Sequence, residues 1–236
     1  MTAECVVRSL GVVLAVLVTA ACTSQQPLID ETFSGTDGPV VTQDWVVTSG
    51  SLFRDHEEGW TGVPDAGGSA GDTGSAVFRM AGTRRDLTDI DMSLRLDVER
   101  LVITERTPAR AYDGAHIWVR YQSDRQLYAV SVDRRDATMV IKKKCAGGES
   151  NGGRYVDLGA AVPDTPIPLG RWQQISVAVR NQPDGSVTIS ADRDGHTVEA
   201  VDRGTGCPPL REGGVGIRGD NAELRFDDIR VVNTTG

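Results

Sequence analysis

Residues 115–133 read AHIWVRYQSDRQLYAVSVD, and apolar side chains alternate with polar ones on both sides of a short polar break. An alternation with a period of two is typical of half-buried β-strands. With residues 123–126 as a loop, the pattern predicts a hairpin that pairs Ile117 with Val132, because that register collects the apolar side chains on one face. The side chains predicted to face the core are Ile117, Val119, Tyr121, Tyr128, Val130 and Val132.

The opposite face of this hairpin is the first candidate ligand site. The predicted register pairs His116 with Asp133, Trp118 with Ser131 and Arg120 with Ala129. Sugars are often bound by an aromatic ring that stacks on the apolar face of the pyranose, while charged groups bond to hydroxyls. The alternative is a solvated outer face on which a neighbouring loop covers Trp118. The candidate ligand-binding residues on this face are His116, Trp118, Arg120 and Asp133.

The other three tryptophans are interpreted from their positions in the chain. Trp60 lies in a glycine-rich stretch, residues 59–75, that is typical of a long exposed loop, and it is a second candidate ligand-binding residue. Trp45 and Trp172 each begin a predicted strand, and we expect both in the core.

The rest of the chain repeats the strand pattern. Residues 91–99 place Met92, Leu94, Leu96 and Val98 on one face, and residues 172–180 and 186–192 predict a hairpin across Gln182-Pro183-Asp184-Gly185. About a dozen short strands are separated by turns rich in Gly, Asp and Pro, and no window has a convincing helical period. The sequence predicts an all-β, antiparallel sandwich (jelly roll) over residues 30–236.

The N-terminus resembles the export signal of bacterial lipoproteins. An apolar run over residues 10–19 is too short to span a bilayer comfortably, and it is followed by Ala20-Ala21-Cys22. Small residues before a cysteine resemble a lipobox, although Thr19 stands where leucine is commoner and only Arg8 makes the n-region basic. The resemblance implies a signal peptide over 1–21, lipidation of Cys22 and a tether over 22–29, hence a lipid anchor on the extracytoplasmic face of the cell membrane. A plain secretory leader or an uncleaved signal anchor is the alternative.

Cysteine usage agrees with export. Cys5 leaves with the leader and Cys22 is assigned to lipid, so Cys145 and Cys207 remain as the pair for one disulfide. A metal site is the alternative, but no second cysteine or histidine stands at ligand spacing.

The net charge limits the partners. At a formal charge of −8, the chain lacks the basic balance that phosphate binding requires, so nucleic acid is not an expected partner. Three consecutive lysines, Lys142 to Lys144, are interpreted as charges that keep an exposed edge strand from pairing with another chain.

Four short motifs in the second half of the chain resemble, in their order, the concanavalin A-like lectin/glucanase superfamily. They are Gly170-Arg171-Trp172-Gln173, Asp194-Gly195-His196, Gly214-Val215-Gly216-Ile217 and Phe226-Asp227-Asp228-Ile229-Arg230-Val231. Laminin-G-like jelly rolls of bacterial surface proteins are the most similar in pattern. The resemblance implies two curved antiparallel sheets and a ligand on the concave sheet or its rim, but it does not choose between binding modules, hydrolases and interaction domains.

Catalytic and metal-binding signals are weaker. Family-16 glycoside hydrolases of this superfamily carry carboxylates at E-x-D-x-E or E-x-D-x-x-E spacing, and the sequence contains no such motif, so we assign no catalytic residue and hydrolysis is the least favoured of the functions considered. No cofactor is expected. A structural calcium ion could tie the chain ends together through Asp30, Glu31, Asp227 and Asp228, but two acidic ends also fit a solvated edge.

The sequence therefore predicts a membrane-anchored lipoprotein whose jelly-roll domain binds carbohydrate or another envelope component without catalysis. A protein-interaction domain without affinity for glycans is the alternative, and a divergent glycoside hydrolase is a third.

Overall fold

The computed structural model describes residues 26–65, 76–105 and 107–234. Within these ranges, sixteen strands form two antiparallel sheets that pack face to face as a sandwich, as the sequence predicts. Four of the strands, β1, β2, β4 and β5, have three residues or fewer, which accounts for the difference from the dozen expected. The lipobox and Cys22 lie outside the described residues, and so does the glycine-rich stretch 66–75.

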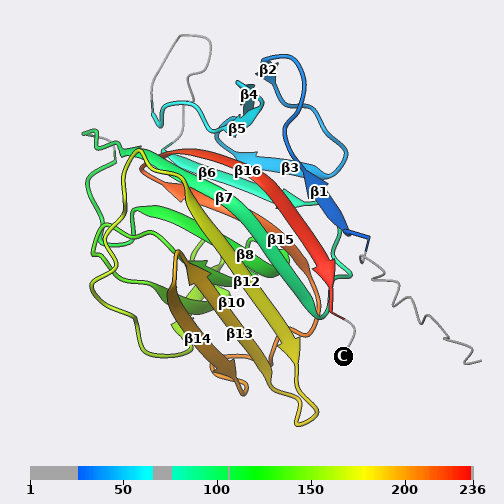
Figure 1. Ribbon diagram of the computed structural model, residues 1–236. Helices are drawn as coiled ribbons and strands as arrows, with labels where there is room; N and C mark the ends of the chain where they lie inside the picture. Colours follow the sequence, from blue (N-terminus) through cyan, green and yellow to red (C-terminus); the bar gives the residue numbers. More distant parts are fainter. Residues whose placement is uncertain (1–25, 66–75, 106, 235–236) are drawn as a thin grey trace, which may run out of the picture.

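The larger sheet has the order β14–β13–β12–β7–β16–β5–β4–β2, with β1 also paired to β16 (Figure 1). Its strands are β1 (Ile29–Glu31), β2 (Gly38–Pro39), β4 (Phe53–Asp55), β5 (Glu58–Trp60), β7 (Ile90–Leu101), β12 (Gln173–Asn181), β13 (Val187–Arg193), β14 (His196–Asp202) and β16 (Ala222–Asn233). The pairing of β1 with β16 brings the first and last strands of the domain side by side. The predicted hairpin of β12 with β13 is confirmed.

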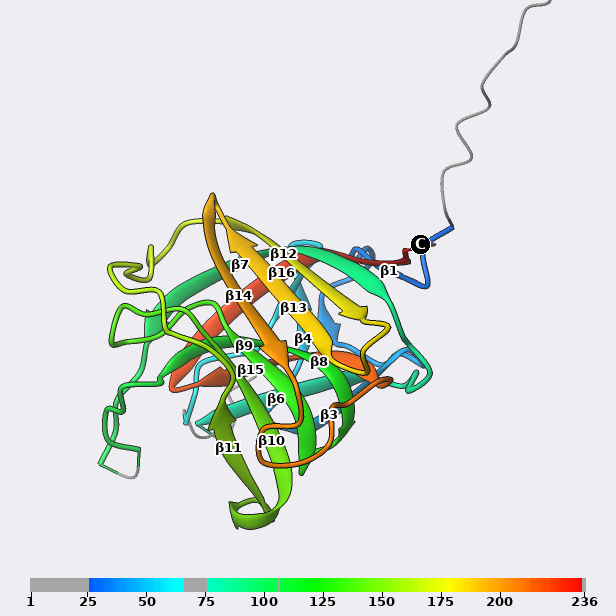
Figure 2. The same ribbon diagram turned by 90° about the horizontal axis from the view of Figure 1, so that it is seen from below.

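The smaller sheet has the order β11–β10–β9–β8–β15–β6–β3 (Figure 2). Its strands are β3 (Trp45–Ser49), β6 (Val77–Gly82), β8 (Gly114–Ser123), β9 (Gln126–Ser131), β10 (Val140–Ser150), β11 (Gly153–Asp157) and β15 (Gly214–Asp220). The described residues include no helix long and apolar enough to cross a membrane.

The main core lies between the two sheets and follows the predicted alternation. On β7, Met92, Leu94, Leu96 and Val98 are all at most 1% exposed, and they belong to one continuous apolar cluster. The hairpin of β8 and β9 adds five of its six predicted core residues, which are Ile117, Val119, Tyr128, Val130 and Val132. Each large apolar side chain buried in this way contributes about 1.5–3 kcal/mol to folding.

The register predicted for this hairpin is wrong. Ile117 pairs with Val130 rather than with Val132, because a bulge interrupts the ladder between Val119 and Ser123. Arg120 lies in this bulge with φ at +51°, in the left-handed region that bulged residues can adopt. Between the two paired positions, three residues of β8 oppose one residue of β9, and Tyr121 turns to the outer face of the smaller sheet, so the sixth predicted core residue packs outside the main core.

The bulge also removes Arg120 from the predicted ligand face. Its side chain is 1% exposed and donates to the carbonyl oxygen of Leu87 (2.8 Å), with Asp89 and Asn181 at 3.3 and 3.4 Å. Burial lowers the pKa of Arg120, and Asp89 partly offsets that effect. Arg120 therefore holds the loop before β7 and is not available to a ligand.

Asp133 also leaves the predicted face. The carbonyl oxygen of Ala115 accepts from the backbone N–H groups of both Val132 and Asp133, which is a second irregularity at the other end of the hairpin. The Asp133 carboxylate is fully buried and accepts from Arg193 (2.5 Å) and Gln173 (3.0 Å) of the larger sheet. Asp133 therefore ties the two sheets together and does not pair with His116.

The three consecutive lysines do not guard an edge, because β11 lies outside β10. Lys143 is fully buried between the sheets and donates to Asp202 (2.7 Å), which also accepts from the Tyr128 hydroxyl (2.6 Å). Lys144 is 1% exposed on the other face of the strand. Only Lys142 reaches solvent, beside Asp157 at 3.0 Å.

The two tryptophans expected in the core differ. Trp45 at the start of β3 is 5% exposed, as predicted. Trp172, directly before β12, is 37% exposed and lies 4.7 Å from the guanidinium carbon of Arg95, so the expectation is wrong there. The ring lies beside Arg95, whose neighbours Leu94 and Leu96 face the core, so Trp172 is on the outer side of the larger sheet.

The predicted disulfide between Cys145 and Cys207 is confirmed. Cys145 lies on β10 of the smaller sheet, and Cys207 lies in the loop that follows β14 of the larger sheet. The bond closes a loop across 62 residues and joins the two sheets beside the Lys143–Asp202 ion pair.

Replacing both cysteines by alanine should lower the free energy of unfolding by about 4 kcal/mol, because a loop of this length loses its closure constraint in the unfolded chain. Urea denaturation with and without dithiothreitol measures the effect. The wild type should become less stable in the reductant and the double variant should be indifferent to it. Equal wild-type midpoints in both conditions would contradict the structural role.

Candidate ligand-binding site

A second, smaller apolar cluster lies on the outer face of the smaller sheet, the face turned away from the core. Its centre is Trp118, whose ring stacks on Tyr121 with centroids 5.2 Å apart and planes at 4°. Gly216 lies opposite Trp118 on β15, and a Cβ there would meet the indole at 3.2 Å and the Met80 carbonyl at 2.4 Å. The buried members of the cluster are Ala81, Trp118, Tyr121, Leu127 and Ala129.

The hairpin of β10 and β11 covers this cluster. Tyr155 of β11 packs against it, and Trp118 is only 1% exposed. With its amide oxygen turned toward β6, Asn151 at the hairpin tip accepts from both terminal nitrogens of Arg79 (3.0 and 2.7 Å). Trp118 is therefore covered by a neighbouring segment, and its ring face is not free to stack on a sugar.

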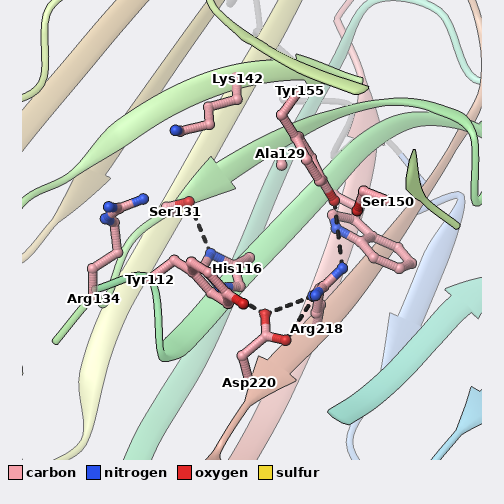
Figure 3. A pocket seen from close by; sticks show the side chains of 11 residues that line it. Tyr112, His116, Ala129, Ser131, Arg134, Lys142, Ser150, Tyr155, Arg218 and Asp220 are labelled. Carbon is pink, nitrogen blue, oxygen red and sulfur yellow. Dashed lines mark hydrogen bonds and ion pairs between the residues drawn. The ribbon is translucent and has the colours of Figure 1, made fainter. Parts of the chain in front are cut away.

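A pocket of about 240 Å³ opens beside the covered tryptophan (Figure 3). Four neighbouring strands, β15, β8, β9 and β10, form its floor, while Tyr155 and the segments before β8 and after β9 form its walls. Its lining residues are Tyr112, His116, Trp118, Ala129, Ser131, Arg134, Lys142, Ser150, Tyr155, Arg218 and Asp220.

A chain of hydrogen bonds crosses the pocket floor. His116 contacts Ser131 through Nδ1 (2.8 Å) and Asp220 through Nε2 (3.2 Å). Arg218 donates to both carboxylate oxygens of Asp220 (2.6 and 2.7 Å) and reaches the Tyr155 hydroxyl at 3.4 Å. Figure 3 shows this chain leading from Ser131 to Tyr155.

The charge on Asp220 fixes the protons in this chain. Burial by itself would raise the pKa of Asp220, but Arg218 and His116 more than offset it and hold that pKa well below its usual value. An ionised carboxylate only accepts, so the Nε2 of His116 carries a proton and donates to Asp220, while Nδ1 contacts the Ser131 hydroxyl. Serine, histidine and aspartate thus stand in the order of a nucleophilic triad.

The exposure of Ser131 favours a structural role for this chain. Ser131 lies on the floor of the pocket and is only 3% exposed, whereas an attacking nucleophile must be accessible to its substrate. The bidentate pair with Arg218 instead makes Asp220 the group that orients that guanidinium toward Tyr155. We therefore assign the chain to positioning of Arg218 at the pocket.

Two of the five predicted ligand-binding residues, His116 and Trp118, line the pocket. Arg120 and Asp133 lie elsewhere, as described above. Trp60 does not lie on a loop, because it is the last residue of β5, and its ring N–H donates to Glu223 (2.9 Å). Phe53 and Arg225 flank the Trp60 ring at 5.7 and 5.5 Å, so the side chain is half-buried in its own contacts.

The sequence interpretation missed most of the charged lining. On β15, Val215 and Ile217 are fully buried in the core, and the alternation they define would have placed Arg218 on the outer face. No comparable signal exists for Tyr112 and Arg134, which lie in segments outside the strands. Tyr155 and Lys142 come to the pocket because β10 and β11 curl over the sheet.

Three of the four residues considered for calcium are paired with arginines, and the fourth, Glu31, accepts from the backbone N–H of Phe33 (2.8 Å). Arg95 donates to Asp227 (2.5 Å) and Asp228 (2.8 Å), and Asp30 lies 3.7 Å from Arg230. In the described part of the chain, no group of three or more His, Cys, Asp or Glu side chains could hold a metal ion.

A second hollow, of about 440 Å³, lies on the outer face of the larger sheet. Its described lining is made of small side chains, including Ser93, Ser176 and Ser190, with acidic groups such as Asp192 and Glu199. This lining holds no aromatic side chain among the described residues, so the first pocket has the richer recognition chemistry.

Replacing Asp220 by asparagine should lower the free energy of unfolding at pH 7 by about 3–5 kcal/mol, because Arg218 and His116 lose a buried partner. The lowered folded-state pKa adds stability above the usual value of 3.8, and that stability is lost as the pH falls. The gap between wild type and variant should therefore narrow below about pH 4. Urea denaturation from pH 7 to pH 3 measures it, with the exposed Asp157→Asn as control; a gap that persists unchanged at pH 3 would contradict this assignment.

No protein-family model matches the chain, and no curated protein matches it either. Solved structures do share its fold. A carbohydrate binding module, CBM66 from Bacillus subtilis, has a TM-score of 0.53 and 13% identity, covering 80% of this chain and 96% of that one. An endo-1,3-beta-glucanase from Streptomyces sioyaensis has a TM-score of 0.54 and 11% identity, covering 92% and 100%.

An inactivated mutant of beta-agarase B in complex with agaro-octaose has a TM-score of 0.57 and 9% identity, covering 86% of this chain and 91% of that one. Identities this low establish the fold alone. The chain thus has the concanavalin A-like jelly-roll fold that carbohydrate-binding modules, lectins and glucanases share.

Proposed function

We propose that this domain is a non-catalytic carbohydrate-binding module whose ligand occupies the pocket on the outer face of the smaller sheet. The observation that carries the proposal is the pocket itself, which combines aromatic walls with polar groups fixed on the strands of a rigid sheet. Ligand sites of proteins usually join an apolar or aromatic lining to a few well-placed polar groups. The same fold supports binding modules and glucanases in the structures it resembles.

The aromatic contact with a sugar comes from tyrosines rather than from Trp118. Tyr112 is 46% exposed at one wall, and Tyr155 is half-buried at the other. A tyrosine ring can stack on the apolar face of a pyranose while its hydroxyl bonds to the sugar or to water. Trp118 supports this arrangement from below by packing the hairpin that carries Tyr155.

The carboxylate content of the pocket supports binding without hydrolysis. A glycoside hydrolase of the usual type needs two carboxyl groups across the scissile bond, about 5–10 Å apart. Asp220 is the one carboxylate in the described lining, and Arg218 and His116 already hold it. On β9, which pairs with β8 across the floor, the outward side chains are Leu127, Ala129 and Ser131.

Replacing Tyr112 by alanine should weaken glycan binding about tenfold, since the stacking contribution of one aromatic ring is lost. Tyr112 is exposed, so the fold should be unaffected. Affinity electrophoresis against a panel of polysaccharides, followed by calorimetry on the best ligand, measures the change. Trp172→Ala removes another exposed aromatic ring outside the pocket and is the control. Equal losses in both variants, or binding of a protein partner in place of any glycan, would contradict the proposal.

We also propose that the domain is held at the extracytoplasmic face of the cell membrane by a lipid on Cys22. The support is the order of the apolar run over residues 10–19, Ala20-Ala21 and Cys22 in the sequence. A binding module anchored in this way would hold envelope or extracellular polysaccharide near the membrane.

Cys22→Ser should move the expressed full-length protein from the detergent phase to the aqueous phase in Triton X-114 partitioning and should block incorporation of labelled palmitate. Cys5→Ser, which changes a cysteine inside the predicted leader, is the matched control and should change neither property. Unchanged partitioning of the Cys22→Ser variant would contradict the anchor.

A further inference from the structure

The described pocket lining carries more cations than carboxylates. Arg134, Lys142 and Arg218 are three cations in its lining. The matching carboxylate in the described lining, Asp220, is already used by Arg218 and His116. A ligand that fits such a lining must supply acceptor oxygens and, to balance the charge, a negative group.

The carboxylates that pair with two of these cations do not lie in the pocket lining. Lys142 contacts Asp157 at 3.0 Å, and the two side chains are 29% and 65% exposed. A single ion pair of this kind at the surface contributes little and is screened by salt, so Lys142 remains able to turn toward an anion inside the pocket. Arg134 is more buried and binds Asp136 through Nε and one terminal nitrogen, so it can offer the N–H groups of its other terminal nitrogen without leaving that carboxylate.

A further group of cations stands behind Tyr155. The Lys144 ammonium lies 5.1 Å from the Tyr155 ring and has no carboxylate partner among the described residues. Burial, together with Arg218 and Arg79, lowers the pKa of Lys144 to about 8. Lys144 and Arg79 thus add to the charge of Arg218 near one wall of the pocket, on a protein whose net charge is −8.

Resting on the proposed function, we infer that the glycan bound in this pocket is acidic, with a carboxylate or sulfate group held by Lys142 together with Arg134 and Arg218. Neutral polysaccharides lack the acceptor charge that this lining requires. Either anionic substituent would fit, and pairs of charged and neutralised polysaccharides distinguish a carboxylate from a sulfate.

Binding to four polysaccharides tests the inference: polygalacturonate and its methyl ester, and a sulfated carrageenan and its desulfated form. We expect tighter binding, by about tenfold or more, to the charged member of at least one pair, since a charge-assisted hydrogen bond contributes about 1.5–3 kcal/mol. The pair that shows the difference identifies carboxylate or sulfate. This preference should weaken as sodium chloride is raised from 50 to 500 mM.

Two variants on the same ion pair give opposite predictions. Lys142→Gln removes a cation of the pocket and should weaken binding of the charged ligand about tenfold. Asp157→Asn frees Lys142 from its exposed partner and should leave that binding unchanged or strengthen it. Arg203→Gln, which removes an exposed cation outside the pocket, is the control and should have no effect.

The outcomes separate the inference from the proposed function. Equal binding of charged and neutral members, with no loss in Lys142→Gln, would overturn the acidic ligand and leave carbohydrate binding in place. Absence of binding to every member of the panel would overturn both.

Discussion

The bulge at Arg120 determines which side chains the outer face of the smaller sheet carries. A regular ladder would place Arg120 on that face and Tyr121 in the core, because side chains of a strand alternate. With Arg120 in the left-handed region of the bulge, its side chain instead binds the loop before β7, and Tyr121 stacks on Trp118. The stacked pair forms the centre of the second apolar cluster, on which the hairpin of β10 and β11 rests.

The covered cluster explains why the pocket lies where it does. Tyr155 reaches over the sheet because Trp118, Tyr121 and Leu127 give it an apolar surface to bury. One side of Tyr155 then closes over the cluster, and the other becomes a wall of the pocket. Lys144 lies over its ring and Arg218 meets its hydroxyl, so packing and charge act on the same residue. The shape of the pocket and its positive lining are thus two results of one packing arrangement.

The sequence predicts the sandwich well because its strands alternate strictly. The period of two on β7 and on the β12–β13 hairpin places apolar side chains on one face, as a sheet with one buried side requires. The disulfide is predicted because only Cys145 and Cys207 remain after Cys5 and Cys22 are assigned to the leader and the lipid. The site is predicted only in part, because nothing in the sequence around Arg120 marks the position of the bulge. Alternation identified the face of His116 and Trp118, but the exposure of Trp118 depends on a hairpin that arrives from residues 140–157. Contacts between segments far apart in sequence cannot be read from the pattern of either segment.

A ligand that enters this pocket lies beside Trp118, which contributes to the lining. The protein has four tryptophans, so a ¹H–¹⁵N correlation spectrum of the folded domain resolves four indole N–H signals, and Trp118→Phe assigns that of Trp118. On titration with the best polysaccharide fragment, the Trp118 indole signal should show a saturable shift, because the ligand changes its surroundings. The indoles of Trp45, Trp60 and Trp172 should stay in place. A shift confined to Trp60 or Trp172, with the Trp118 signal unchanged at saturation, would contradict binding in this pocket.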